Sequence, residues 1–258
     1  MRFLPVFLFL ASGHTNAPYY VSEGRGEPTV LFVHGWTCDS SLFKGQIDEL
    51  SRKFRVIAMD LPGHGRTPLP AGSFTPRTFT DALEEVLNAA KVKKAVLAGH
   101  SMGGVVIRAY ARIHPDRVLG LIFLDSMFQM EDTPEMHAFP SQFEGAKGLE
   151  ARRKMIEGMF VDATSPALRE KILSVMLKPP DSVAVASMAW MVDELTKPPE
   201  KINPPSLILV QDGGKCPPTD MFAKTPRFAA VKGTGHFLMC EKSHEVNSYI
   251  SAFLADFR

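Results

Sequence analysis

The hexapeptide GHSMGG at residues 99–104 decides the fold of this chain. It matches the pattern Gly-x-Ser-x-Gly, with Ser101 at its centre and small residues on both sides. The β-rich apolar run Lys94–Ala98 precedes it, and the helical pattern Gly103–Ile113 follows it. A serine on such a strand-to-helix turn holds its hydroxyl exposed, and flanking glycines keep the strained turn free of collisions. This context predicts that Ser101 is a nucleophile.

Apolar runs and helical patterns alternate along most of the chain. The runs expected to form strands are Tyr19–Ser22, Thr29–Val33, Arg55–Met59, Lys94–Ala98, Val118–Leu124, Ser206–Val210 and Phe228–Val231. The helices expected between and after them are Ser41–Arg52, Thr78–Ala90, Gly103–Ile113 and His244–Phe257. Because most of the strands are continuously apolar, they suit a parallel sheet that is covered on both faces. We therefore predict an α/β fold with a mostly parallel central sheet flanked by helices.

Residues 127–205 break this alternation, because they contain no good strand. The helices expected there are Gly148–Phe160, Pro166–Leu177 behind an N-cap at Ser165, and Ser182–Leu195 behind Asp181. We interpret 127–205 as a helical cap inserted into a core made of 18–126 and 206–258. Eight of the 13 methionines lie in this segment, which suits either an adaptable apolar pocket wall or ordinary helix packing.

Charge and cysteine content exclude several classes of function. The chain has 258 residues and a net charge of +1, which gives no argument for binding nucleic acid or an anionic membrane surface. Its three cysteines, Cys38, Cys216 and Cys240, have no metal-type spacing, so we expect free or buried thiols. We expect no metal site and no cofactor. The oligomeric state does not follow from the sequence.

Residues 1–17 permit two interpretations. Met1-Arg2, the apolar run Phe3–Ala11 and a small polar stretch resemble a short signal peptide, which would make the protein secreted or periplasmic. The alternative is a first strand at Val6–Leu10, which would leave the protein in the cytoplasm. The apolar run is too short to span a membrane, and no other segment is apolar enough to be an integral membrane segment.

The partners of Ser101 are expected in two other loops. His236 lies in a glycine-rich loop between the last strand and the last helix, where its imidazole could act as the base. The amide of Met102, at the start of a helix, and the amide of Trp36 are the expected oxyanion donors. Gly35 permits the backbone to turn there. Gly35 and Trp36 are also expected to line the substrate-binding pocket.

Four motifs in this order resemble the α/β-hydrolase superfamily, in particular its capped esterase and lipase-like branch. They are FVHGW at 32–36, DLPGHG at 60–65, GHSMGG at 99–104 and GHF at 235–237. The resemblance runs from about Tyr19 to the C-terminus and implies an α/β-hydrolase fold. It is much less specific for the substrate, because this fold hosts many chemistries.

The third member of the catalytic triad departs from the family pattern. In this superfamily the acid usually follows the strand that corresponds to Ser206–Val210, but the expected position falls on Gly213 or Gly214. Asp212 lies one or two residues too early. An alternative family position, at the end of the strand before the cap, is occupied by Asp125. We expect Asp125 to be the acid, with Asp212 as the alternative.

These residues together predict a serine esterase that cleaves a small-molecule carboxylic ester through an acyl-enzyme intermediate. The sharp strand-to-helix turn that carries Ser101 is called the nucleophile elbow. Epoxide hydrolases and haloalkane dehalogenases of this fold carry aspartate at the elbow, so Ser101 weighs against them. Hydrolysis of a lactone, an amide or a C–C bond, perhydrolysis and cyanohydrin lysis stay open. A non-catalytic ligand-binding homologue is the alternative from another class. Neither the substrate nor its acyl-chain preference follows from the sequence.

Overall fold

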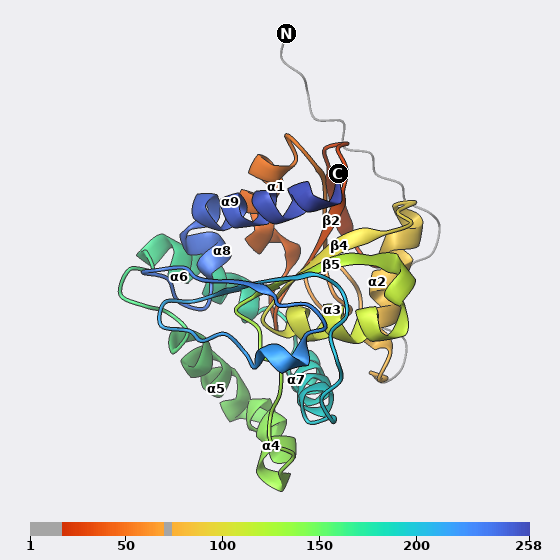
Figure 1. Ribbon diagram of the computed structural model, residues 1–258. Helices are drawn as coiled ribbons and strands as arrows, with labels where there is room; N and C mark the ends of the chain where they lie inside the picture. Colours follow the sequence, from red (N-terminus) through yellow and green to blue (C-terminus); the bar gives the residue numbers. More distant parts are fainter. Residues whose placement is uncertain (1–16, 70–73) are drawn as a thin grey trace.

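A computed structural model describes residues 17–69 and 74–258. Within them, seven strands form one sheet in the order β1-β3-β2-β4-β5-β6-β7 (Figure 1). The strands are β1 (Tyr20–Glu23), β2 (Thr29–Val33), β3 (Arg55–Met59), β4 (Ala95–His100), β5 (Val118–Leu124), β6 (Ser206–Val210) and β7 (Arg227–Ala230). Only the β1–β3 pair is antiparallel among these strands. The predicted mostly parallel sheet is confirmed.

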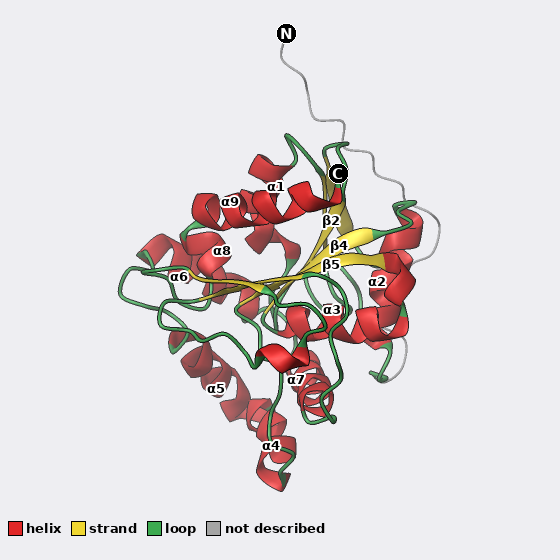
Figure 2. Ribbon diagram, viewed as in Figure 1, coloured by secondary structure: helices red, strands yellow, loops and turns green. Residues whose placement is uncertain are grey.

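Helices cover both faces of this sheet (Figure 2). The α-helices are α1 (Lys44–Leu50), α2 (Thr78–Ala89), α3 (Met102–Ile113), α4 (Pro134–Ala138), α5 (Gly145–Glu157), α6 (Pro166–Met176), α7 (Asp181–Leu195), α8 (Leu238–Glu241) and α9 (Ser243–Leu254). Helices α1 and α9 pack together on one face, and α2 packs against α3 on the other. The inner strands β2 and β4 are buried along their whole length, as expected for a sheet covered on both sides.

The order of the strands creates a crevice at one edge of the sheet. Strands β2 and β4 are neighbours, with Val33 opposite Gly99, but the chain leaves them in opposite directions. From β2 it continues to β3 on one side, and from β4 it continues to β5 on the other. Loops that diverge at the carboxyl ends of two such strands form the usual ligand site of open α/β sheets. Here the two loops begin at His34 and Ser101.

A helical insert lies between β5 and β6, as predicted, and contains α4 to α7. Ser165 caps α6, because its hydroxyl accepts a hydrogen bond from the amide of Leu168. The interpretation of residues 127–205 as a separate cap stays a prediction. The short helix α4 and the 3-10 helix Phe139–Phe143 (η3) were not predicted, because neither is long enough to show a helical period.

Several predicted element boundaries differ from the structure. Helix α7 begins at Asp181, behind an extended Pro180, so Asp181 is its first residue and not its N-cap. Helix α5 spans Gly145–Glu157, so it begins and ends three residues before the predicted Gly148–Phe160. The predicted helix Ser41–Arg52 is a 3-10 turn, Ser40–Phe43 (η1), followed by α1, and Asp39 caps the turn.

Two further predictions concern the two ends of the chain. The predicted helix His244–Phe257 begins one residue earlier and ends in a 3-10 turn, Ala255–Phe257. The choice between a signal peptide and a first strand falls almost wholly on residues 1–16. Those residues lie outside the part of the chain that the structure describes.

Glycines allow the first turn of α3 to pack directly against the sheet. A Cβ atom on Gly99 would lie 2.3 Å from the carbonyl carbon of Gly103. A Cβ atom on Gly103 would lie 2.1 Å from the carbonyl oxygen of Val33 in β2. Real atoms cannot approach so closely, so any side chain at these positions must push the helix away from the strands. The small residues of the hexapeptide therefore fix the distance between α3 and the sheet.

We predict that Gly103→Ala lowers the free energy of unfolding by at least about 2 kcal/mol, because the added methyl group collides with backbone. Gly158→Ala is the matched control, since Gly158 has an ordinary φ of −68° and its Cβ would meet nothing closer than 3.4 Å. The control should leave stability unchanged or raise it by about 0.4–1 kcal/mol. Urea denaturation measures both, and equal stabilities would contradict the packing argument.

Candidate functional site

Ser101 sits in a strained conformation between β4 and α3. Its φ of 51° and ψ of −118° lie in a region that side chains other than glycine rarely adopt. Two hydrogen bonds hold it there: its amide donates to the carbonyl of Leu124 at 3.0 Å, and its carbonyl accepts from the amide of Gly104 at 2.9 Å. Ser101 remains partly exposed at the carboxyl edge of the sheet. The turn thus presents a hydroxyl in the crevice formed by the strand order.

Asp125 and His236 form a close pair at the same edge. His236 lies in the loop between β7 and α8, and its Nδ1 is 2.6 Å from Oδ2 of Asp125. Asp125 directly follows β5, with a positive φ of 47°. The amide of Gln211 donates to Oδ1 of Asp125 at 3.0 Å, so both carboxylate oxygens are engaged. The two side chains are 18% and 11% exposed, so their interaction is only weakly screened by water.

The electrostatics of this pair keep the carboxylate charged. Burial by itself would raise the pKa of Asp125, but the hydrogen bond and charge of His236 and the amide of Gln211 outweigh it and hold the pKa below its ordinary value. An ionised Asp125 accepts a hydrogen bond from Nδ1–H of His236, which fixes the tautomer and leaves Nε2 as the basic nitrogen. The arrangement can therefore accept a proton at Nε2 and stabilise the resulting imidazolium.

Asp212 lies elsewhere in the loop region. Its side chain is exposed, and Oδ2 accepts a hydrogen bond from the amide of Gly233 at 2.8 Å. Its own amide donates to the carbonyl of Thr234 at 3.1 Å. Asp212 thus ties the loop after β6 to the loop that carries His236. The structure brings Asp125, and not Asp212, into contact with the imidazole.

Two backbone amides in the loops that begin at His34 and Ser101 have no hydrogen-bond partner among the described residues. They belong to Trp36 and to Met102, the residues predicted as oxyanion donors. Gly35 brings the first loop against the elbow, because a Cβ atom on Gly35 would lie 3.1 Å from the Cβ of Ser101. Met102 is the first residue of α3, where amide groups lack intrahelical acceptors. Both amides are therefore free to donate to an acceptor outside the protein, and their role as oxyanion donors stays a prediction.

The side chain of Trp36 connects the core to the helical insert. It is 3% exposed, and its Nε1 donates to the carbonyl of Ala184 in α7 at 2.8 Å. Its ring also lies 4.7 Å, between centroids, from Phe143. Because Trp36 and Gly35 are consecutive, this anchoring also holds the position of the loop beside Ser101. Their predicted role as a substrate-binding surface stays a prediction.

Sequence reasoning assigned His100 no role of its own, but the structure shows that it contacts the loop of His236. Its Nε2 lies 2.9 Å from the carbonyl oxygen of His236, and the two imidazole rings are 4.7 Å apart. Burial and the neighbouring His236 lower the pKa of His100 to about 3, so its ring is neutral and Nε2–H is the donor. His100 therefore ties the loop of His236 to the elbow, one residue before Ser101.

The model of the alpha/beta hydrolase fold family matches residues 28–173, which is more than half of the chain. The chain belongs to the α/β-hydrolase fold family. The AB hydrolase superfamily protein YisY of Bacillus subtilis is 28% identical over 253 residues, covering 89% of this chain and 92% of that protein. A thermophilic esterase of Thermogutta terrifontis, solved with malate bound, superposes with a TM-score of 0.78 at 27% identity, covering 93% of each chain.

A third relative of this α/β hydrolase matches only in part. The pimeloyl-[acyl-carrier protein] methyl ester esterase of Edwardsiella ictaluri is 33% identical over 111 residues. That match covers 43% of this chain and 41% of the relative, so this chain spans less than half the length of that protein. The match shows that the two proteins share a segment, and it does not assign the substrate of the relative to this chain.

The helical insert of this α/β hydrolase also positions the histidine loop. Glu241, at the end of α8, accepts a hydrogen bond from the amide of Gly235 at 2.7 Å and another from the hydroxyl of Thr164 in the insert. The amide of His236 donates to the carbonyl of Met159 at 3.3 Å. Sequence reasoning missed Glu241, because α8 has only four residues. The one sequence feature that could have indicated this role is the presence of a glutamate five residues after the predicted base.

Three further findings concern metal sites, membrane spans and cysteines in this α/β hydrolase. Within 17–69 and 74–258, no three His, Cys, Asp or Glu side chains gather as they would around a metal ion. None of the helices in these two ranges has the length and hydropathy needed to cross a bilayer. All three cysteines are free thiols.

Proposed function

We propose that this α/β hydrolase is a serine esterase that cleaves carboxylic esters through a Ser101–His236–Asp125 triad. The observation that carries the proposal is the 2.6 Å contact between Asp125 Oδ2 and His236 Nδ1, at the edge where the elbow exposes Ser101. A carboxylate, an imidazole and a serine on three separate loops are the parts that acyl transfer needs. The third relative and the Thermogutta protein, both described as esterases, support an ester as the substrate.

The first half of the reaction forms an ester bond to the protein. Nε2 of His236 takes the proton of the Ser101 hydroxyl while Oγ attacks the carbonyl carbon of the substrate. The carbonyl π electrons move onto oxygen, and the amides of Trp36 and Met102 donate hydrogen bonds to this oxyanion. One such donor typically lowers the barrier by about 2.7–4 kcal/mol. The bond to the leaving alkoxide then breaks, and His236 gives that oxygen its proton.

The second half of the reaction releases the acid. A water molecule loses a proton to Nε2 of His236 and attacks the acyl carbon, the same two amides hold the second oxyanion, and the bond to Oγ breaks. The proton returns from His236 to Ser101. Asp125 stays ionised throughout and stabilises the imidazolium in both halves. This role agrees with the low pKa of Asp125.

The experiment that tests this function is hydrolysis of p-nitrophenyl acetate and p-nitrophenyl butyrate by the wild type and by Ser101→Ala. The variant lacks the nucleophile, so kcat should fall by about 10⁶-fold, to the background rate. Ser248→Ala, at an exposed position of α9, is the control and should match the wild type. A folded wild type that hydrolyses neither ester, or no faster than Ser101→Ala, would instead favour a ligand-binding protein.

A second prediction concerns the acid of the triad. Asp125→Asn should lower kcat by about 10³–10⁴-fold, because the amide no longer holds the correct tautomer of His236 or stabilises its charged form. Asp212→Asn removes an exposed carboxylate that accepts from Gly233, so its effect should stay within about tenfold. Steady-state kinetics on both variants, with circular dichroism to verify folding, compares them. A larger loss in Asp212→Asn would overturn the assignment of Asp125.

A further inference from the structure

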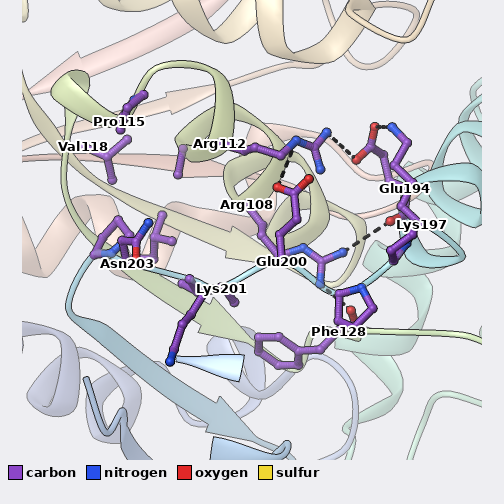
Figure 3. A pocket seen from close by; sticks show the side chains of 16 residues that line it. Arg108, Arg112, Pro115, Val118, Phe128, Glu194, Lys197, Glu200, Lys201 and Asn203 are labelled. Carbon is purple, nitrogen blue, oxygen red and sulfur yellow. Dashed lines mark hydrogen bonds and ion pairs between the residues drawn. The ribbon is translucent and has the colours of Figure 1, made fainter. Parts of the chain in front are cut away.

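A separate cleft lies at the base of the insert, between α3 and the segment 197–204 that leads back to β6 (Figure 3). Its volume is about 500 Å³, which is within the usual range for small-molecule sites. Ser101, Asp125 and His236 are not among the described residues that line it. The cleft is therefore distinct from the proposed catalytic site.

The lining of this cleft combines an apolar surface with an excess of positive charge. The apolar residues that line it are Ala111, Pro115, Val118, Leu121, Phe128, Pro198, Pro199, Ile202 and Pro204, of which Val118 and the four prolines are the more exposed. The charged side chains are Arg108, Arg112, Lys197, Lys201, Glu194 and Glu200. Four cations thus face two carboxylates within one concave surface. Such a surface attracts an anion, and more strongly than a flat one would.

The two carboxylates are already engaged by cations other than Arg108. Glu194 pairs with Arg112 at 3.0 Å through Oε2 and with Lys197 through Oε1. Glu200 lies 3.7 Å from the Nε of Arg112. The side chain of Glu194 is only 4% exposed, so these pairs are held in place. Neither carboxylate forms an ion pair with Arg108 or Lys201, the other two cations of the cleft.

Arg108 makes no ion pair with a carboxylate of the described residues. Its guanidinium donates only to carbonyl oxygens, those of Phe128 and, at 3.4 Å, Glu194. Figure 3 shows Arg108 in the middle of the cleft, with both of these contacts drawn as dashed lines. Burial lowers the pKa of Arg108, which fits a charge that is desolvated without full compensation. A guanidinium of this kind is suited to a carboxylate, which it can bind through two parallel hydrogen bonds.

We propose that this cleft binds an organic monocarboxylate with an aliphatic or aromatic body. The carboxylate meets Arg108, and the body lies against the apolar lining, to which Val118 and the four prolines contribute the more exposed surface. An inorganic anion would leave that apolar surface uncovered, and an uncharged molecule would leave the charge of Arg108 only partly compensated. Phe128 belongs to the segment that enters the insert, and 197–204 is the segment that leaves it. A bound ligand therefore contacts both connections of the insert to the core.

The test is calorimetric titration of the full chain with three probes. Octanoate carries both charge and apolar body, octanamide carries the body without the charge, and acetate carries the charge with almost no body. Octanoate should bind at least about tenfold more tightly than either of the others, since each lacks one of the two interactions. Octanamide binding as tightly as octanoate would overturn the assignment of a carboxylate site.

Variants locate the binding. Arg108→Gln should weaken octanoate binding at least about tenfold, and Lys201→Glu, which reverses a charge at the exposed rim, at least about threefold. Lys224→Gln, an exposed lysine outside the cleft, is the control and should leave the affinity unchanged. Unchanged affinity in folded Arg108→Gln would overturn the proposal, because octanoate would then be bound elsewhere, for example as a product at Ser101. If Arg108→Gln does not fold, unchanged affinity in Lys201→Glu has the same consequence.

Discussion

The contact between the start of α3 and strands β2 and β4 is the constraint on which the rest of this structure depends. It is possible only because Gly99 and Gly103 carry no side chain at points where backbone atoms nearly touch. The contact forces Ser101 into a left-handed conformation and places the first amides of α3 at the crevice between the diverging loops. Backbone strain of this kind costs about 1–3 kcal/mol and persists only where the surroundings impose it.

The other elements of the site are arranged around that turn by the sheet. Because β4, β5 and β6 are parallel neighbours, their carboxyl ends bring Ser101, Asp125 and Gln211 to one edge. The loop of His236 reaches this edge from β7, and the contacts that hold it include those with His100, with Asp125 and, through Gly235, with Glu241. Glu241 also bonds to the helical insert, so the insert and the histidine loop are mechanically linked. The insert thus contributes to the position of the proposed base.

The sequence predicted the central parts because their signals are local. Continuous apolar runs gave the parallel strands, and glycines around Ser101 marked the turn. The pairing of Asp125 with His236 was expected from a family position, since nothing local distinguishes Asp125 from Asp212. His100 and Glu241 were missed because their contacts with the carbonyl of His236 and the hydroxyl of Thr164 join segments far apart in the chain. The cleft around Arg108 was invisible for the same reason, since its lining comes from α3, β5 and the segment 197–204.

The most direct measurement of the central claim is mass spectrometry of the protein quenched in acid during turnover of p-nitrophenyl acetate. The account predicts one added acetyl group, located by proteolysis on the peptide that contains Ser101, because acid stops the loss of the acyl group from the serine. The same treatment of Ser101→Ala should leave the peptide unmodified. Turnover of the ester with no acetyl group on Ser101, or with the group on another residue, would contradict the account.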